Sequence, residues 1–233
     1  MTDMLITCEH GGNQVPTEFQ SLFSTAGASQ ALYSHRGYDP GALDAANQFA
    51  KALHAELIAS ETTRLLVDLN RSQDNPQLYS RFTSILSDGA KAKLLSNWYL
   101  PYRQRVENEL YRQIASVGRV VHLSIHTFTP KFHGQWRPID VGLLFDPDRS
   151  TEKEFCDTWQ SQINHQRPRL RVIANQPYAG TDDGFTTALR RKFPNANYAG
   201  IEVEINHRYW KRSAKSQQSV VKTLLDAIVD LLS

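Results

Sequence analysis

Short apolar runs alternate along the chain with segments in which apolar residues recur every three or four positions. Runs of about four to eight apolar residues are typical of buried strands, and a period of about 3.6 is typical of amphipathic helices. The apolar runs are 5–8, 65–69, 120–125, 141–145, 170–174 and 200–205. The helical pattern predicts helices over 41–57, 90–117, 153–166, 184–193 and 217–232. Pro101 divides the second of these, in the first turn of its latter part.

This alternation is typical of an α/β domain, in which helices cover a mixed, largely parallel sheet. The 233 residues contain no internal repeat, low-complexity tract or long linker. A chain of this length can bury a substantial core as one unit. We therefore expect a single three-layer domain over residues 1–233.

Composition and charge exclude several classes of protein. The formal net charge is +2, and the Lys and Arg residues are spread along the chain. Both features argue against a nucleic-acid binder. The two cysteines, Cys8 and Cys156, form no Cys-x-x-Cys pair and predict a reduced, cytoplasmic protein. No signal peptide and no apolar stretch of ~20 residues is apparent, so we expect no membrane association. The oligomeric state stays open.

Polar clusters directly follow four of the apolar runs. They begin at Glu9, Asp68, His126 and Asn175. In open α/β sheets, ligands bind beyond the carboxyl ends of the strands. We therefore expect these four clusters to converge at one edge of the sheet.

Two strand-end histidines, His10 and His126, are candidate metal ligands. A catalytic zinc usually has three protein ligands and one open position. Asp39, just before a predicted helix, is our choice for the third ligand, and His35 is a weaker candidate. Each residue also has a structural interpretation: the histidines as hydrogen-bonded turn residues, Asp39 as a helix cap. This set accepts other divalent metals besides zinc.

Glu202 and Glu204 are candidates for the general base. Positions i and i+2 of a strand share one face, and two acids in an otherwise apolar strand are unusual. Spacing does not say which of them is the base, and both would face solvent if the strand lay at an edge of the sheet.

A third group of residues is suited to binding a substrate. Arg71 has a planar fork that matches a carboxylate, Asn70 can bind the same group, and Asp68 can orient a neighbour. The alternative is a surface salt-bridge cluster. Tyr178 and Arg137 are further candidates, for holding the substrate or an oxyanion.

Together these segments resemble the N-formylglutamate amidohydrolase family. The shared segments are His10-Gly-Gly with Pro16, His35-Arg-Gly-Tyr-Asp-Pro-Gly-Ala-Leu, Asp68-Leu-Asn-Arg, His126-Thr-Phe-Thr-Pro, Arg137-Pro with Val141-Gly-Leu-Leu, Asn175-Gln-Pro-Tyr-Ala-Gly and Gly200-Ile-Glu-Val-Glu-Ile-Asn. The resemblance implies a phosphorylase/hydrolase-like fold, one zinc ion per chain, and hydrolysis of the amide bond of a small N-acyl amino acid. The Asp-Leu-Asn-Arg run also looks like the substrate-binding run of aspartoacylase-like enzymes.

The chain departs from related patterns at two places. The zinc carboxypeptidases have a Glu three residues after the first His, where this chain has Asn13, so Asp39 is the best supplier of the third ligand. Many family members read Pro-His-Ser-Gly where this chain reads Glu9-His10-Gly11-Gly12. Two other functions stay open: a carboxypeptidase-like zinc peptidase, and a non-catalytic carboxylate-binding protein of the same fold.

Overall fold

The computed structural model describes residues 3–232, without the side chains of residues 214 and 232. Six strands form one sheet in the order β2-β1-β3-β8-β6-β7. They are β1 (Asp3–Cys8), β2 (Glu56–Ala59), β3 (Val120–Phe128), β6 (Val141–Leu144), β7 (Val172–Ala174) and β8 (Tyr198–Asn206). The pairing of β6 with β8 is antiparallel and the other pairings in this sheet are parallel. The expected mixed, largely parallel sheet is confirmed.

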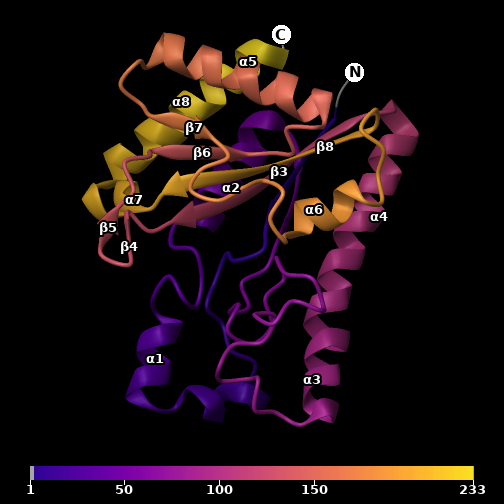
Figure 1. Cartoon of the computed structure of the whole chain (residues 1–233), viewed down its shortest axis with the longest axis vertical. Coiled ribbons are helices and arrows are strands. Elements are labelled where there is room, and N and C mark those ends of the chain that lie inside the picture. The colour runs from indigo at the N-terminus through magenta and orange to yellow at the C-terminus, as the bar shows by residue number, and fades with distance from the viewer. Residues whose placement is uncertain (1–2, 233) are drawn as a thin grey trace.

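Helices cover both faces of this sheet, which gives three layers (Figure 1). One face packs against α2 (Ala42–Leu53), α5 (Ser150–Gln166) and α8 (Ala214–Leu232). The other packs against α4 (Leu100–Val117), α6 (Phe185–Arg190) and the segments around α1 (Ala26–Leu32). The remaining elements are the 3-10 helix η1 (Thr17–Phe23), α3 (Asp88–Leu94), the π-helix η2 (Leu95–Tyr99), α7 (Arg208–Arg212) and the small hairpin of β4 (Lys131–Phe132) and β5 (Gln135–Trp136). No helix in residues 3–232 is long and apolar enough to cross a bilayer.

The two faces of the central strands differ in polarity. In β3, Val121, Leu123 and Ile125 belong to the apolar core beneath α2, α5 and α8. Because side chains alternate along a strand, His122 and the polar residues at positions 124 and 126 lie on the opposite face. That face carries the candidate site.

Two segments differ from the expectation. The helix predicted over 41–57 ends at Leu53, and Leu57 lies in the edge strand β2. His54 takes the left-handed conformation that ends the helix, a role that glycine usually has. The apolar run 65–69 forms turns rather than a strand. Its apolar side chains are buried in the second apolar core, which lies between the sheet and α4. The backbone amide of Asp68 donates to Leu78 O instead of to a neighbouring strand.

The helical region 90–117 contains Pro101 in the first turn of α4, as expected. Instead of a break, a π turn over Leu95–Tyr99 joins α3 to α4, and the three form one column in Figure 1. A proline ring clashes with the carbonyl four residues earlier in a regular helix. The wider π turn accommodates that ring and lets the column continue.

Candidate metal centre

His10, Asp39 and His126 meet at the carboxyl edge of the central strands. All three are buried, and one possible ligand atom from each lies within 4.8 Å of the others. Asp39 Oδ2 lies 3.4 Å from His10 Nδ1 and 2.9 Å from His126 Nδ1. Three residues far apart in the sequence thus form one cluster that can hold a metal ion, as the sequence predicts.

His10 follows β1, and its ring is fixed by Asp68. The Nε2 atom lies 2.7 Å from Asp68 Oδ1. A carboxylate only accepts hydrogen bonds, so the proton of the neutral imidazole is on Nε2. His10 Nδ1 therefore presents a lone pair to the cluster, and it has no hydrogen-bond partner among the described residues.

His126 is fixed in the same way by different residues. Its Nε2 lies 3.1 Å from Glu9 Oε2 and 2.9 Å from Ser124 Oγ. The Ser124 hydroxyl donates to Glu9 Oε2 at 2.6 Å, so its oxygen is left to accept. Both partners thus act as acceptors for a proton on Nε2, and Nδ1 faces Asp39.

Asp39 is positioned by the turn that precedes α2. Its backbone amide donates to His10 O at 2.9 Å, which joins this turn to the end of β1. The helix cap is Gly41, and no side chain caps α2. The Asp39 carboxylate instead contacts both histidines with one oxygen and Arg64 with the other. The structure therefore places Asp39 as a potential ligand rather than as a cap.

Glu202 and Glu204 lie on the site face of β8, next to β3. Glu204 pairs in register with His126, and Glu202 with Ser124. Glu202 Oε1 accepts a hydrogen bond from Thr186 at 2.8 Å, whereas Glu204 Oε2 is buried without a partner among the described residues. Since β8 is a central strand, the solvent-facing interpretation of these acids does not apply.

A cavity of about 350 Å³ opens onto the cluster. His10, Asp39, His126, Glu202 and Glu204 are in its lining. Its other lining residues are His35, Arg64, Asn70, Arg71, Gln77, Thr127, Phe128, Thr129, Phe132, Tyr178, Ala179, Asp182 and Asp183. The volume matches a small-molecule site.

The proposed substrate-binding residues lie in different positions around this cavity. Arg71 is held by its bond to the backbone oxygen of Asp183, and Asn70 accepts from the amide of Phe185. Arg137 is stacked against the rings of Phe132 and Tyr178 and donates to the Tyr178 hydroxyl at 3.2 Å. Arg137 is therefore fixed against two residues of the cavity wall.

Burial and charge shift the pKa values of these groups. Burial, helped by the charge of Arg64, lowers the pKa of His10 to about 4 despite the carboxylate of Asp68. Burial alone would also lower the pKa of His126, but the hydrogen bond and charge of Glu9, together with the charges of Glu204 and Glu202, raise that pKa to about 9. Burial raises the pKa of Glu204. Neutral His10 suits metal ligation, and a carboxyl with a raised pKa suits proton transfer near neutral pH.

Sequence reasoning missed Glu9 and Arg64. Glu9 is fully buried behind His126, and Arg64 contacts Asp39 and lines the cavity. A signal for Glu9 existed, because an acid directly after a buried strand and before His10 needs a partner in the core. Arg64 lies in a loop, and its sequence neighbours carry no such signal. His35 lines the cavity but is not part of the cluster.

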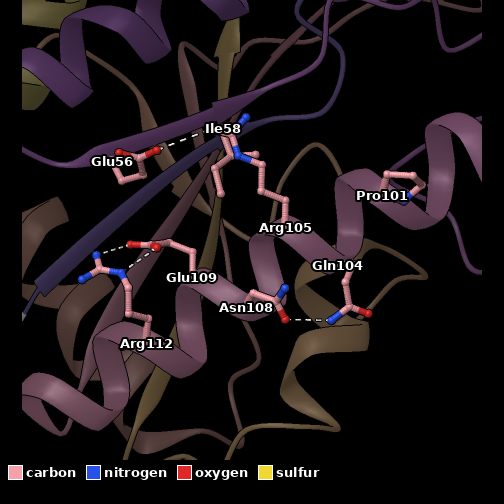
Figure 2. A pocket seen from close by; sticks show the side chains of 8 residues that line it. All are labelled: Glu56, Ile58, Pro101, Gln104, Arg105, Asn108, Glu109 and Arg112. Atoms are coloured by element: carbon pink, nitrogen blue, oxygen red, sulfur yellow. Dashed lines mark hydrogen bonds and ion pairs between the residues drawn. The ribbon is translucent and has the colours of Figure 1, made fainter.

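A second groove, of about 450 Å³, lies between the edge strand β2 and α4 (Figure 2). Its charged side chains pair with one another: Arg105 lies 3.3 Å from Glu56, and Arg112 binds Glu109. Gln104 likewise donates to Asn108 at 2.8 Å. Unlike the candidate metal centre, this groove has no buried side-chain nitrogen or oxygen that lacks a hydrogen-bond partner among the described residues.

The model of the N-formylglutamate amidohydrolase family matches residues 2–210 of the chain. The chain belongs to this family. Its fold is also that of solved structures. A gene product of Agrobacterium tumefaciens is 25% identical with a TM-score of 0.82, and the match covers 100% of this chain and 92% of that one.

A second solved structure is an N-formylglutamate amidohydrolase from Ralstonia eutropha. It is 16% identical with a TM-score of 0.68, and the match covers 99% of this chain and 93% of that one. The comparison with curated proteins finds no match. The chain is thus a hydrolase of the N-formylglutamate amidohydrolase family with a buried His-Asp-His cluster.

Proposed function

We propose that this family member hydrolyses the amide bond of a small N-acyl amino acid, of the N-formyl type, with one zinc ion per chain. The observation that carries the proposal is the buried cluster of His10, Asp39 and His126 beside Glu204. Two imidazoles and a carboxylate are the ligand set of many catalytic zinc sites.

The residues fit a cation at this position. His10 Nδ1 is buried without a hydrogen-bond partner in the described structure and points at Asp39 Oδ2. Leaving such an atom unpaired is costly, and a cation would satisfy it. Asp68 and Glu9 behind the two imidazoles match the carboxylate partners that metal-bound histidines usually have. Manganese or cobalt would fit the same atoms.

When bound, zinc supplies a Lewis acid that polarises an acyl carbonyl and lowers the pKa of a water molecule towards ~7. We assign the general base to Glu204 rather than Glu202, because Glu204 Oε2 is unpartnered while Glu202 already accepts from Thr186. Glu204 would take a proton from the attacking water and pass it to the leaving amine.

Two cationic groups are suited to the oxyanion that develops on the acyl oxygen. Arg64 lies in the cavity wall beside Asp39, whereas Arg137 is held against Tyr178 and Phe132. We therefore assign the oxyanion to Arg64 in preference to Arg137.

Asn70 and Arg71 would bind the substrate carboxylate, because a guanidinium recognises that group with charge-assisted hydrogen bonds. Tyr178 would support the substrate at the cavity wall, where it holds Arg137. Asp68 would act through His10, whose ring it orients. Binding in this way fixes the acyl carbon relative to Glu204, which supplies part of the rate.

The test combines elemental analysis of the purified protein with a panel of N-formyl and N-acetyl amino acids and short peptides. One zinc per chain with release of a free amino acid from the N-acyl compounds supports the proposal. Faster cleavage of peptides would favour a carboxypeptidase-like function, and bound metal without any turnover would favour a binding protein. His126→Ala should lose both metal and activity.

A further inference from the structure

We infer that Glu9 is a positioning residue for the metal centre: its buried carboxylate holds His126 so that Nδ1, and not Nε2, faces Asp39 and His10. The inference rests on the proposed function, since it concerns the ligands of the proposed ion.

Three side chains from two elements, β3 and α4, surround the Glu9 carboxylate. Oε2 accepts from Ser124 of β3 at 2.6 Å and lies 3.1 Å from His126 Nε2. Oε1 accepts from Tyr102 of α4 at 2.9 Å. Glu9 is 0% exposed, so solvent competes for none of these bonds.

This arrangement keeps a proton on Nε2 of His126. Ser124 already donates its hydroxyl proton to Glu9, and the Glu9 carboxylate has no proton to give. A hydrogen bond to His126 Nε2 therefore requires Nε2–H. Nδ1, the atom 2.9 Å from Asp39 Oδ2, is then the nitrogen left to give up its proton and bind a cation.

Glu9 also contributes charge. Glu9, Asp39 and Asp68 carry three negative charges around the two imidazoles, and Arg64 beside Asp39 carries one positive charge. Counted with the neighbouring carboxylates of Glu202 and Glu204, these negative charges outnumber the positive ones and favour a cation. Because the site is buried, removing one of them weakens cation binding more than it would at the surface.

The same role is already visible for Asp68 behind His10. The two carboxylates lie behind different imidazoles, so each ring is oriented independently of the other. Glu9 differs in its third partner: Tyr102 connects it to α4, and the Tyr102 hydroxyl also contacts Ile58 O at 3.1 Å. The orientation of His126 is thus tied to the packing of α4 on the sheet.

The experiment compares the full chain with the variants Glu9→Gln and Glu152→Gln. Glu152 is the matched control, because it is also 0% exposed, but it lies apart from the centre, where it accepts hydrogen bonds from Arg190 and forms an ion pair with Arg149. Zinc affinity is measured by competition with a chelator, and thermal unfolding is measured on the metal-free proteins. We expect Glu9→Gln to weaken zinc binding about 10- to 100-fold. Glu152→Gln should lower the unfolding temperature without changing zinc affinity.

A second measurement needs no variant. In the zinc-loaded chain with ¹⁵N-labelled histidine, side-chain ¹H–¹⁵N correlation spectra should show His126 protonated on Nε2 and not on Nδ1. A proton on Nδ1 overturns the inference, even if Glu9→Gln does not fold. Equal zinc affinity of the parent and Glu9→Gln also overturns it, and leaves the proposed function standing. A parent chain that binds no divalent cation overturns both.

Discussion

Glu202 and Glu204 leave the same face of β8, two residues apart, yet their surroundings differ. Thr186 donates to Glu202, which is partly exposed. Glu204 is 7% exposed, and one of its oxygens has no partner among the described residues. A base needs an oxygen that is available to a proton, and burial raises the pKa of Glu204 towards the working range.

We predict that Glu204→Gln lowers kcat by about 10²- to 10⁴-fold while metal content stays at the parent level. The amide keeps the shape of the side chain but cannot take the proton. Steady-state kinetics and elemental analysis on the same sample check this. Glu202→Gln is the matched variant and should have the smaller effect on kcat; the opposite order would assign the base to Glu202.

We predict a different kinetic signature for Arg71→Lys. The planar fork of Arg71 is lost while the charge stays, so a two-point contact with a carboxylate becomes a single one. The loss of a hydrogen bond to a charged group corresponds to about 1.5–3 kcal/mol. We expect kcat/KM to fall by about 10- to 100-fold, mainly through KM, with bound zinc unchanged. A change confined to kcat would place Arg71 elsewhere in the reaction.

The three residues of the candidate metal centre were predictable from sequence, but the groups that hold them in place were not. His10 and His126 each follow an apolar run, and strand ends of a parallel sheet meet at one edge. The residue that fixes His126 depends on tertiary structure, because β1 must pair with β3 and α4 must pack against both before Glu9 can reach the imidazole. Glu9 and Ser124 are 115 positions apart, so no local pattern joins them.

Among the elements, the turn between α1 and α2 controls the position of Asp39. Gly41 has φ of 90°, in the left-handed region, and a Cβ there would collide with the indole ring of Trp210. The sequence pattern indicates a turn before the helix, but the packing of α7 against it is a tertiary contact that the pattern does not contain.

We predict that Gly41→Ala destabilises the protein by at least about 2 kcal/mol. The left-handed conformation costs about 1–2 kcal/mol for a residue with a Cβ, and the contact with Trp210 adds to that. Zinc affinity should fall as well, because the turn carries Asp39. Gly27→Ala in α1, where a Cβ meets no atom within 4 Å, should leave stability unchanged or raise it by up to about 1 kcal/mol. Urea unfolding of both variants checks this; equal stabilities would contradict the proposed constraint.

The helices and central strands were predicted better than residues 54–69, which follow α2. Apolar residues from 41 to 57 keep a helical spacing, and neither glycine nor proline ends it. His54 ends α2 by its backbone conformation, and β2 forms because β1 offers it an edge. The run 65–69 is apolar enough for a strand, but burial in the second core satisfies it without pairing.

Across the whole molecule, the sheet has one apolar face, and its other face carries buried polar side chains that extend from the candidate metal centre into the interior. His122 is the innermost of these on β3: Nε2 lies 2.8 Å from Thr7 of β1, and Nδ1 lies 2.8 Å from the Tyr198 hydroxyl of β8. Three neighbouring strands are thus joined through one imidazole. Burial, with a smaller contribution from Arg190, lowers the pKa of His122 from 6.5 to about 4.

This lowered pKa makes the stability of the fold depend on pH. Between pH 6.5 and 4 the unfolded chain binds a proton at His122 and the folded chain does not, so protons favour unfolding. The contribution is fully present above pH 6.5, is lost as pH falls towards 4, and does not change further below that. We predict that the free energy of unfolding falls by about 2 kcal/mol more between pH 7 and pH 5 in the parent than in His122→Gln. Both proteins are measured without metal, so the pKa shifts of the other histidines are the same in the parent and the variant and cancel in the difference. Parallel pH dependences of the two proteins would show that His122 is not the group that titrates.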